Sequence, residues 1–252
     1  MIQKKRKQRN EVIDKLKALI NSLFSASEQG AFYIPRPVVN GVQSLFQDSA
    51  GTVPVTADGD PVGRMLDQSG NGNHASQSVS AERMGYGAPN GLLQDQIDDR
   101  IGISGLNLTP VTGTKTWTLC VGYSDLGTES IILLNNGVNT AQWVGIGDSG
   151  STATGLSGVG VIQVSVWFDG ALESPTNRGD MWSLLAASGV VVIEFLVFDN
   201  SNWSAPVIGK YSAGIYYGPK KSEFWMLREG SLTESERKDV EAYAAEQAGI
   251  TL

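Results

Sequence analysis

The sequence predicts an all-β domain, a β-sandwich or jelly roll, with one helix near each end of the chain. Short segments rich in β-branched and aromatic residues recur along most of the sequence, separated by turn residues. Glycine is abundant, at 30 of 252 residues, and charged residues make up only 18%, as expected for many strands joined by tight turns. A chain of this length can bury a sizeable core as one large sandwich.

The first helix is predicted over residues 9–27. Its apolar residues recur at spacings of three and four and so share one face: Val12, Ile13, Leu16, Leu19, Ile20, Leu23 and Phe24. Four of them fit an a/d seam, but over less than two heptads, which is too short to predict a coiled coil. A lone helix of this length is marginal in water. The sandwich, a sister subunit or a different protein must therefore cover its apolar stripe, and Gly30 is expected to end the helix.

Charge is distributed unevenly along the chain. Residues 1–24 hold seven basic residues against two acidic ones, a net charge of +5, whereas the rest holds 12 against 24, a net charge of −12. A basic arm on an acidic body indicates that the arm has its own partner, and the alternative is a solvated, frayed terminus. The residues expected to bind that partner are Lys4, Lys5, Arg6, Lys7, Ile13, Leu16, Ile20 and Leu23.

The nature of this partner follows from the rest of the composition. The body is acidic and does not interleave basic with aromatic residues, so docking to an acidic protein surface is favoured over nucleic acid. Apolar runs stay well short of the roughly 18–20 residues of a membrane span, so no span is expected. The basic start is not followed by an apolar segment with a cleavage site, so no signal peptide is expected. The single Cys120 excludes an internal disulfide framework.

Two prolines, Pro35 and Pro37, predict an extended, stiff connector over residues 31–37. The chain is accordingly divided into an anchor over 1–30, the connector, and a sandwich over 38–252. The segment Val190–Phe198 is apolar almost throughout and is expected to be a central strand covered on both sides. Strands are predicted at 43–48, 92–93, 101–103, 116–123, 130–134, 141–146, 159–168, 181–186, 190–198, 203–211, 215–217 and 224–227.

A second helix is predicted over residues 234–248. Thr233 and Glu236 form a capping box, an apolar stripe follows at helical spacing, and Gly249 stops the helix. At the other end of the sandwich, Asp67 and Ser69 are placed to cap a sharp Ser-Gly-Asn turn over 69–73.

Three motifs in order resemble laminin-G-like, concanavalin-A-like domains. Residues 62–75 (VGRMLDQSGNGNHA) are similar to the opening motif W-x-D-x-S-G-N-G-x-x-A of these domains, with Met65 or Leu66 where the family often has Trp. Residues 93–101 resemble F-D-G-x-D-D-x-L, with Gln94 replacing the Phe and Gln96 the Gly. Residues 227–237 resemble the closing R-x-L-T-x-x-E-R element. The resemblance covers about residues 38–250 and implies a concanavalin-A-like sandwich.

Residues 44–56 (SLFQDSAGTVPVT) resemble the version of this domain found in virion proteins of tailed bacteriophages. That resemblance implies a non-enzymatic structural, decoration or adhesion component of a virion assembled in the host cytoplasm. The helix would anchor it to capsid or tail, and the protein would be a homo-oligomer, with a trimer through the helix as one form. The alternatives are a carbohydrate-binding module for host-surface attachment and a glycan-cleaving enzyme.

Several residues are weighed as metal or catalytic groups. The run 67–72 mimics the first half of a calcium-binding EF-hand loop, with Asp58, Asp60, Asp67 and Asn71 as the ligands, but Ser78 stands where a bidentate Glu is needed. A capped turn is therefore favoured, and no cofactor is expected. Asp95, Asp98 and Asp99 offer paired carboxylates, although the resemblance implies that they organise a turn. His74 is the only histidine, so a catalytic triad would have to use it. No nucleophile motif of the Gly-x-Ser-x-Gly type lies between a predicted strand and helix.

Tryptophans are the residues considered for stacking on sugar rings. Core packing is favoured for most of them, and Trp203 is the best candidate for exposure because its surroundings, residues 199–204, are polar. The tryptophans weighed for this role are Trp143, Trp167, Trp182, Trp203 and Trp225.

Overall fold

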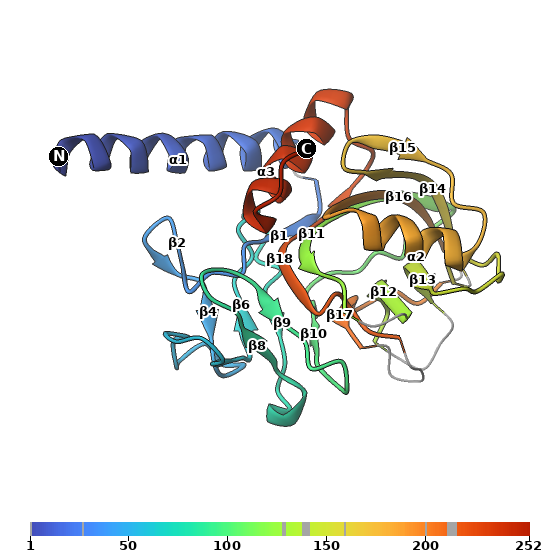
Figure 1. Ribbon diagram of the computed structural model, residues 1–252, viewed down its shortest axis with the longest axis horizontal. Coiled ribbons are helices and arrows are strands. Elements are labelled where there is room, and N and C mark those ends of the chain that lie inside the picture. Colours follow the sequence, from blue (N-terminus) through green and yellow to red (C-terminus); the bar gives the residue numbers. More distant parts are fainter. Residues whose placement is uncertain are drawn as a thin grey trace.

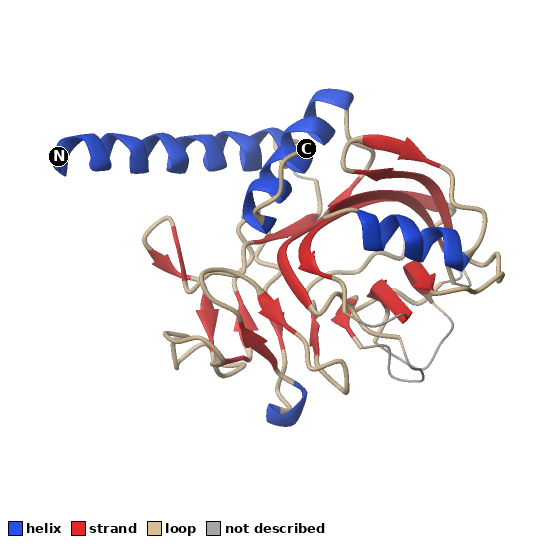
Figure 2. Cartoon of the chain, viewed as in Figure 1, coloured by secondary structure: helices blue, strands red, loops and turns tan. Residues whose placement is uncertain are grey.

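The computed structural model describes residues 2–26, 28–127, 130–137, 142–158, 160–199, 201–210 and 216–252. These residues form two large antiparallel sheets, a small two-stranded hairpin and three α-helices (Figures 1 and 2). The predicted β-rich, sandwich-like class is confirmed. Among the described residues, no helix is both long enough and apolar enough to cross a membrane.

The first sheet has nine strands in the order β15-β14-β16-β11-β18-β9-β8-β5, with β1 pairing beside β18. Its strands are β1 (Gly30–Tyr33), β5 (Pro61–Val62), β8 (Met84–Tyr86), β9 (Leu92–Leu93), β11 (Thr114–Asp125), β14 (Val161–Phe168), β15 (Ala171–Glu173), β16 (Val190–Phe198) and β18 (Lys221–Glu229).

The second sheet has seven strands in the order β13-β12-β17-β10-β7-β6-β4. They are β4 (Leu45–Phe46), β6 (Arg64–Met65), β7 (Ala75–Ser76), β10 (Arg100–Gly102), β12 (Ser130–Asn135), β13 (Trp143–Asp148) and β17 (Val207–Gly209). The hairpin joins β2 (Val38–Val39) to β3 (Val42–Gln43), and the helices are α1 (Ile2–Leu23), α2 (Arg178–Ala187) and α3 (Glu234–Ala248), with a 3₁₀ turn at Ser80–Glu82.

The main core fills the space between the two sheets, and period-2 alternation decides which side chains enter it. On β11, Trp117, Leu119, Val121 and Tyr123 share the main core, whereas Cys120 faces the other side of the sheet. Strand β16 lies between β14 and β11, so its predicted central position is confirmed. Residues 190–193 are buried on both faces, whereas Glu194, Leu196 and Phe198 on one face are only partly buried.

A second apolar layer lies on the outer face of the first sheet, beneath α3. Val240 and Ala244 of α3 pack there with Cys120, and the Phe224 ring lies 4.9 Å from that of Phe32. Gly122 permits the close approach, because a Cβ at that position would lie 2.8 Å from the carbonyl oxygen of Ala244. The predicted helix over 234–248 and its Thr233–Glu236 capping box are confirmed.

Several strand predictions need correction. The strand predicted over 43–48 is reduced to β4, with Gln43 in β3, and in the described part of 215–217 only Tyr217 forms a bridge, to Ile131. Residues 181–186 form part of α2 rather than a strand, because Asn177 caps the helix by accepting from the Asp180 N–H (2.9 Å) and the run lacks β-branched residues. Met181 and Leu185, four apart, form its buried stripe. The strand predicted over 203–211 is only Val207–Gly209. Positions 141, 159, 211 and 215 of the predicted strands lie outside the described residues.

The N-terminal segment also differs from expectation. Helix α1 begins at Ile2 and ends at Leu23, earlier at both ends than the predicted 9–27. Gly30 is not its end but the first residue of β1, where a Cβ would lie 2.0 Å from the Leu227 carbonyl oxygen. Residues 31–33 of the predicted connector are therefore a buried strand, paired antiparallel with β18. The sheet thus includes a segment that the sequence placed before the sandwich.

Candidate functional site

A groove lies between α1, the hairpin β2–β3 and α3. Its volume is about 1140 Å³. Leu16 and Leu19 of α1 line one side, Val38 and Val39 of β2 another, and Tyr243 of α3 the inner end. Figure 1 shows α1 as a rod that extends past the hairpin, with α3 crossing near its C-terminal end. Residues of α1, the hairpin and α3 therefore all contribute to the lining of the groove.

The C-terminal half of α1 belongs to the body of the molecule. Leu23 is fully buried and Leu16 is 5% exposed, and both pack in the layer beneath α3. Arg228 of β18 fixes the helix end: its Nε donates to the Leu23 carbonyl oxygen, and its Nη2 lies 3.0 Å from a Glu28 carboxylate oxygen. The helix ends where this buried guanidinium satisfies one of its last carbonyl groups.

The N-terminal half of α1 projects away from the body (Figure 1). The predicted partner-binding residues Lys4, Lys5, Arg6 and Lys7 belong to this half, and only their helical backbone is described. Of the apolar partner-binding residues, Leu16 and Leu23 are buried in the protein's own body, whereas Ile13 and Ile20 are partly buried. The structure thus separates the predicted anchor into a half that packs on its own chain and a basic half that does not.

The groove combines an apolar interior with a charged rim. Lys15 of α1 and Arg36 line it together with Asp239 and Glu246 of α3. Burial raises the pKa of the Tyr243 phenol above its usual range, so Tyr243 stays neutral at physiological pH. A groove with apolar and charged lining is the kind of surface that amphipathic peptide segments bind.

Sequence reasoning missed the hairpin side of this groove, although a signal for it was present. Asn40 and Gly41 both adopt positive φ (52° and 83°), as in the Asn-Gly turns that join two-residue hairpins. Val38 and Val42 beside them are 52% and 63% exposed. Valines flanking an Asn-Gly pair could have indicated an exposed apolar hairpin.

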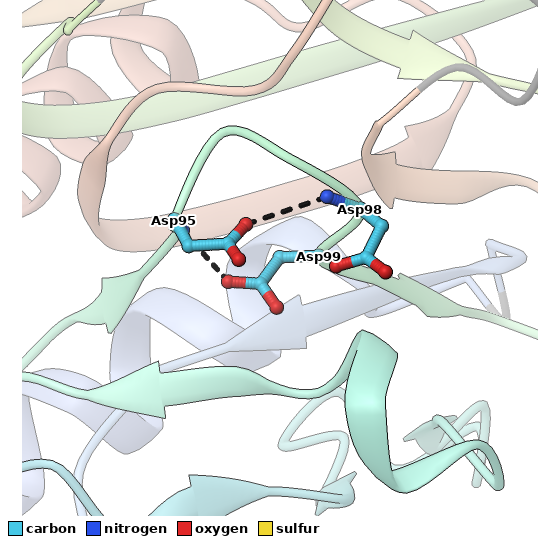
Figure 3. A group of neighbouring side chains, drawn as sticks. All are labelled: Asp95, Asp98 and Asp99. Carbon is cyan, nitrogen blue, oxygen red and sulfur yellow. Dashed lines mark hydrogen bonds between the residues drawn. The ribbon is translucent and has the colours of Figure 1, made fainter.

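Three carboxylates gather in the turn between β9 and β10 (Figure 3). One oxygen from each of Asp95, Asp98 and Asp99 lies within 4.8 Å of the others. Asp99 Oδ2 accepts from the Asp95 N–H (2.7 Å), and Asp95 Oδ1 accepts from the Ile97 N–H (2.8 Å). Burial raises the pKa of Asp99 to about 6, and the negative charges of Asp95 and Asp98 add to the rise.

These bonds organise the turn, as the resemblance implied. Lys210 also reaches it, since its Nζ donates to the Ile97 carbonyl and its N–H to the Asp99 carbonyl (2.9 Å). Three carboxylates offer the oxygen ligands that divalent cations prefer. The Lys210 ammonium group lies beside the turn, so the protein itself places one positive charge near these carboxylates.

The residues weighed as calcium ligands are used by separate turns. Asp67 Oδ1 accepts from the N–H groups of Phe32 and Ser69 (both 2.9 Å), and its Oδ2 accepts from the Asn73 N–H (3.0 Å) and Ser69 Oγ (2.7 Å). His74 Nδ1 accepts from the Asp67 N–H (3.1 Å), and burial lowers the pKa of His74. The predicted capped turn is confirmed, and it also ties β1 to the sandwich.

The remaining three weighed ligands bind other backbone groups. Asp60 Oδ2 accepts from the Thr56 N–H (2.8 Å), and Asp58 Oδ1 accepts from the Ala88 N–H (2.8 Å). Asn71 Nδ2 donates to the Glu28 carbonyl (3.0 Å). The structure therefore gives each of these side chains a local structural role.

The expectation that Trp203 is exposed is wrong. The Trp203 side chain is fully buried in the main core. The main-chain N–H of Trp203 donates to Thr109 Oγ1 (2.8 Å), and its main-chain carbonyl accepts from the Leu108 N–H (2.9 Å). The polar residues around it satisfy the backbone at the surface, and the indole points inward. Trp225 is buried as well, whereas Trp143, Trp167 and Trp182 are partly exposed.

One aromatic pair is accessible on the second sheet. The Arg178 guanidinium lies 5.8 Å from the Trp143 ring centroid and 5.9 Å from that of Tyr216, and its Nη1 donates to the Tyr216 hydroxyl (3.0 Å). A cation over two rings is a common stabilising arrangement. It also leaves an aromatic and hydrogen-bonding surface of the kind that sugars contact.

No protein-family model matches the sequence, and no curated protein matches it either.

Proposed function

We propose that this protein is a non-enzymatic structural or adhesion component of a tailed-phage virion. Its N-terminal helix docks on a capsid or tail protein, and the sandwich faces outward. The observation that carries the proposal is the first half of α1, a basic helical segment that extends clear of the body (Figure 1). The resemblance of residues 44–56 to virion proteins supplies the biological setting.

The physical argument concerns the stability of this segment. Residues 2–10 contain five basic residues and no acidic one. Most helical stability in proteins comes from tertiary packing, so a helical end that projects from the body tends to fray even though the rest of the helix is packed. Basic side chains that follow one another in a helix also repel at low ionic strength. An acidic partner surface would offset both effects, so the segment suits a docking role.

The structure also defines how the anchor should be removed. Deletion of residues 1–30 would take away two core leucines of α1 and the first residue of β1, and the body would lose packing. Deletion of residues 1–10 removes the projecting basic segment alone. We therefore treat residues 1–10 as the anchor to be tested.

The test is incorporation into particles. Particles that lack the protein are supplied with the full chain, with residues 11–252, or with a control lacking only the exposed Thr251 and Leu252. Circular dichroism first verifies that all three are folded. Immunoblots of gradient-purified particles should then contain the full chain and the control but not residues 11–252. Incorporation of residues 11–252 at the full-chain level would refute the anchor.

A carbohydrate-binding module is the second candidate function. The partly buried Trp143 and Tyr216, whose ring centroids lie 5.8 Å and 5.9 Å from the Arg178 guanidinium, favour it, because aromatic faces and a guanidinium are the groups that contact sugar rings and hydroxyls. A glycan array separates the two candidates. Binding that is lost in Trp143→Ala and kept in Trp167→Ala would support adhesion, and no binding by the intact protein would leave docking alone.

A further inference from the structure

We infer that the groove between α1, the β2–β3 hairpin and α3 holds the α1 helix of a second copy of this chain, antiparallel to its own α1. The two copies would exchange helices reciprocally, each filling the other's groove. This self-association does not rest on the virion proposal. It uses the same basic segment, so a copy whose first half fills a neighbour's groove cannot dock that segment on a virion protein at the same time.

The dimensions of the groove suit a helix. An α-helix with its side chains is about 10–12 Å across and rises 1.5 Å per residue, so about ten residues of helix occupy a volume close to that of the groove. The groove measures about 1140 Å³ and runs beside Ile13–Ser22 of α1. The residues that line it come from three separate elements, α1, the hairpin and α3, so a helix lying alongside α1 would contact all three.

Some of the side chains that line the groove leave apolar area exposed. Ile13 and Leu19 of α1 line it and are only partly buried by their own chain. Across the groove, Val38 of the hairpin is 52% exposed. An amphipathic helix packing here would cover apolar area on both sides, which is the main source of stability in such associations.

Charge selects the direction of the incoming helix. The C-terminal half of α1 packs near α3, where Asp239 and Glu246 are exposed at the rim of the groove. Lys15 and Arg36 also line the groove, so its lining is mixed in charge, and the acidic groups are those of α3. Neither acid forms an ion pair within the described part of the chain. An antiparallel helix brings its basic first half to this acidic end. A parallel helix would instead place two basic halves side by side.

Charge and symmetry together identify the partner as a second copy. The chain itself supplies the required ligand, a helix with a basic first half and an apolar second half. An antiparallel pair related by a two-fold axis uses the same surface on both copies, and so it closes as a dimer without leaving a free groove. The basic arm of each copy then meets the acidic body of the other.

Two charge-reversal variants of the full chain test this pairing. The arm variant carries Lys4→Glu, Lys5→Glu, Arg6→Glu and Lys7→Glu, and the rim variant carries Asp239→Lys and Glu246→Lys. Sedimentation velocity should show a dimer for the unmodified chain. Each variant alone should associate at least tenfold more weakly, because like charges would meet at both ends of the interface. An equimolar mixture should restore the dimer, since opposite charges then face each other at both ends.

Two controls show whether a variant associates weakly only because it is misfolded or because its net charge has changed. The changed positions are exposed or in the projecting segment, and equal thermal unfolding temperatures will verify that both variants fold. A variant with Asp98→Lys and Glu173→Lys, away from the groove, changes net charge as much as the rim variant and should remain a dimer.

Four outcomes would overturn the inference. They are a monomeric full chain at 100 μM, a trimer, variants that dimerise unchanged, and a mixture that fails to restore the dimer. A monomer that still enters particles through residues 1–10 would leave the virion proposal standing. A dimer that does not enter particles would remove that proposal and retain this inference.

Discussion

Arg228 of β18 donates a hydrogen bond from its Nε to the main-chain carbonyl of Leu23, the last residue of α1. Only 7% of the Arg228 side chain is exposed, and it also pairs with Glu28 (3.0 Å) and Glu236 (3.6 Å). One guanidinium thus joins the N-terminal helix, the central sheet and the first turn of α3. Loss of this group would leave two carboxylates and a carbonyl without their shared donor.

Replacing Arg228 with Met should therefore lower the free energy of unfolding by about 3 kcal/mol, the scale for breaking a buried ion pair. Chemical denaturation measures this loss. Arg100→Met is the control, because Arg100 pairs with Glu82 at side-chain exposures of 29% and 21%, and its loss should cost less than about 1 kcal/mol. Equal losses in the two variants would contradict the assigned role.

The acidic turn predicts a specific dependence of stability on pH. The pKa of Asp99 is about 6 in the folded protein, above its ordinary value of 3.8, because burial and two neighbouring carboxylates favour the neutral form. The folded protein then binds more protons than the unfolded chain between about pH 4 and 6, so stability falls as pH rises through this window.

Asp99→Asn should remove most of this decline and raise stability at pH 7 by about 1–3 kcal/mol. The amide oxygen still accepts from the Asp95 N–H, so the turn is kept. Urea denaturation at several pH values tests the prediction. Asp98→Asn removes only one neighbouring charge and should shift the decline to lower pH. An unchanged pH profile in Asp99→Asn would show that another group causes any slope.

The close packing of α3 on β11 gives a third prediction. Gly122→Ala should destabilise the protein by about 1–3 kcal/mol, because the new Cβ would lie 2.8 Å from the Ala244 carbonyl and force the helix outward. Gly102→Ala in β10 is the matched control, since its nearest neighbours lie at 3.8 Å. Thermal unfolding compares the two variants, and a similar midpoint for both would rule out the close contact.

Trp203 gives a fourth prediction, which concerns stability rather than glycan binding. Trp203→Ala should cost about 3–5 kcal/mol, because it opens a large cavity in the main core. Trp203→Phe should cost less, since it retains much of the volume and removes an indole N–H that has no hydrogen-bond partner among the described residues. Denaturation curves test both. A Trp203→Ala variant of normal stability would show that this site is not core.

Sequence patterns predicted the parts of this fold that local physics determines. The alternation of β11, the apolar run of β16 and the capping box of α3 each depend on residues close together in the chain. Sequence patterns gave wrong predictions where a segment far away in the chain determines the local structure. Gly30 looks like a helix stop, but its place beside Leu227 is set by pairing with β18, about 200 residues later.

The same limit applies to the groove. The sequence indicated an apolar stripe and a basic arm on α1, yet it could not show that Leu16 and Leu23 are covered by the protein's own body. That outcome depends on α3 and on Arg228 near the other end of the chain. The prediction that Trp203 is exposed was wrong for a related reason. Polar residues on both sides predict an exposed backbone, but they do not determine the direction in which the indole points.

The pairing of β1 with β18 has a consequence for synthesis of the protein. A nascent chain emerging from the ribosome has made α1 and β1 long before the strand that will hold them exists. The opening segment must therefore wait, with its leucines in water, until residues 221–229 have been translated. Closing contacts of such long sequence separation slow folding. We expect α1 and β1 to reach their final packing only after β18 has been translated.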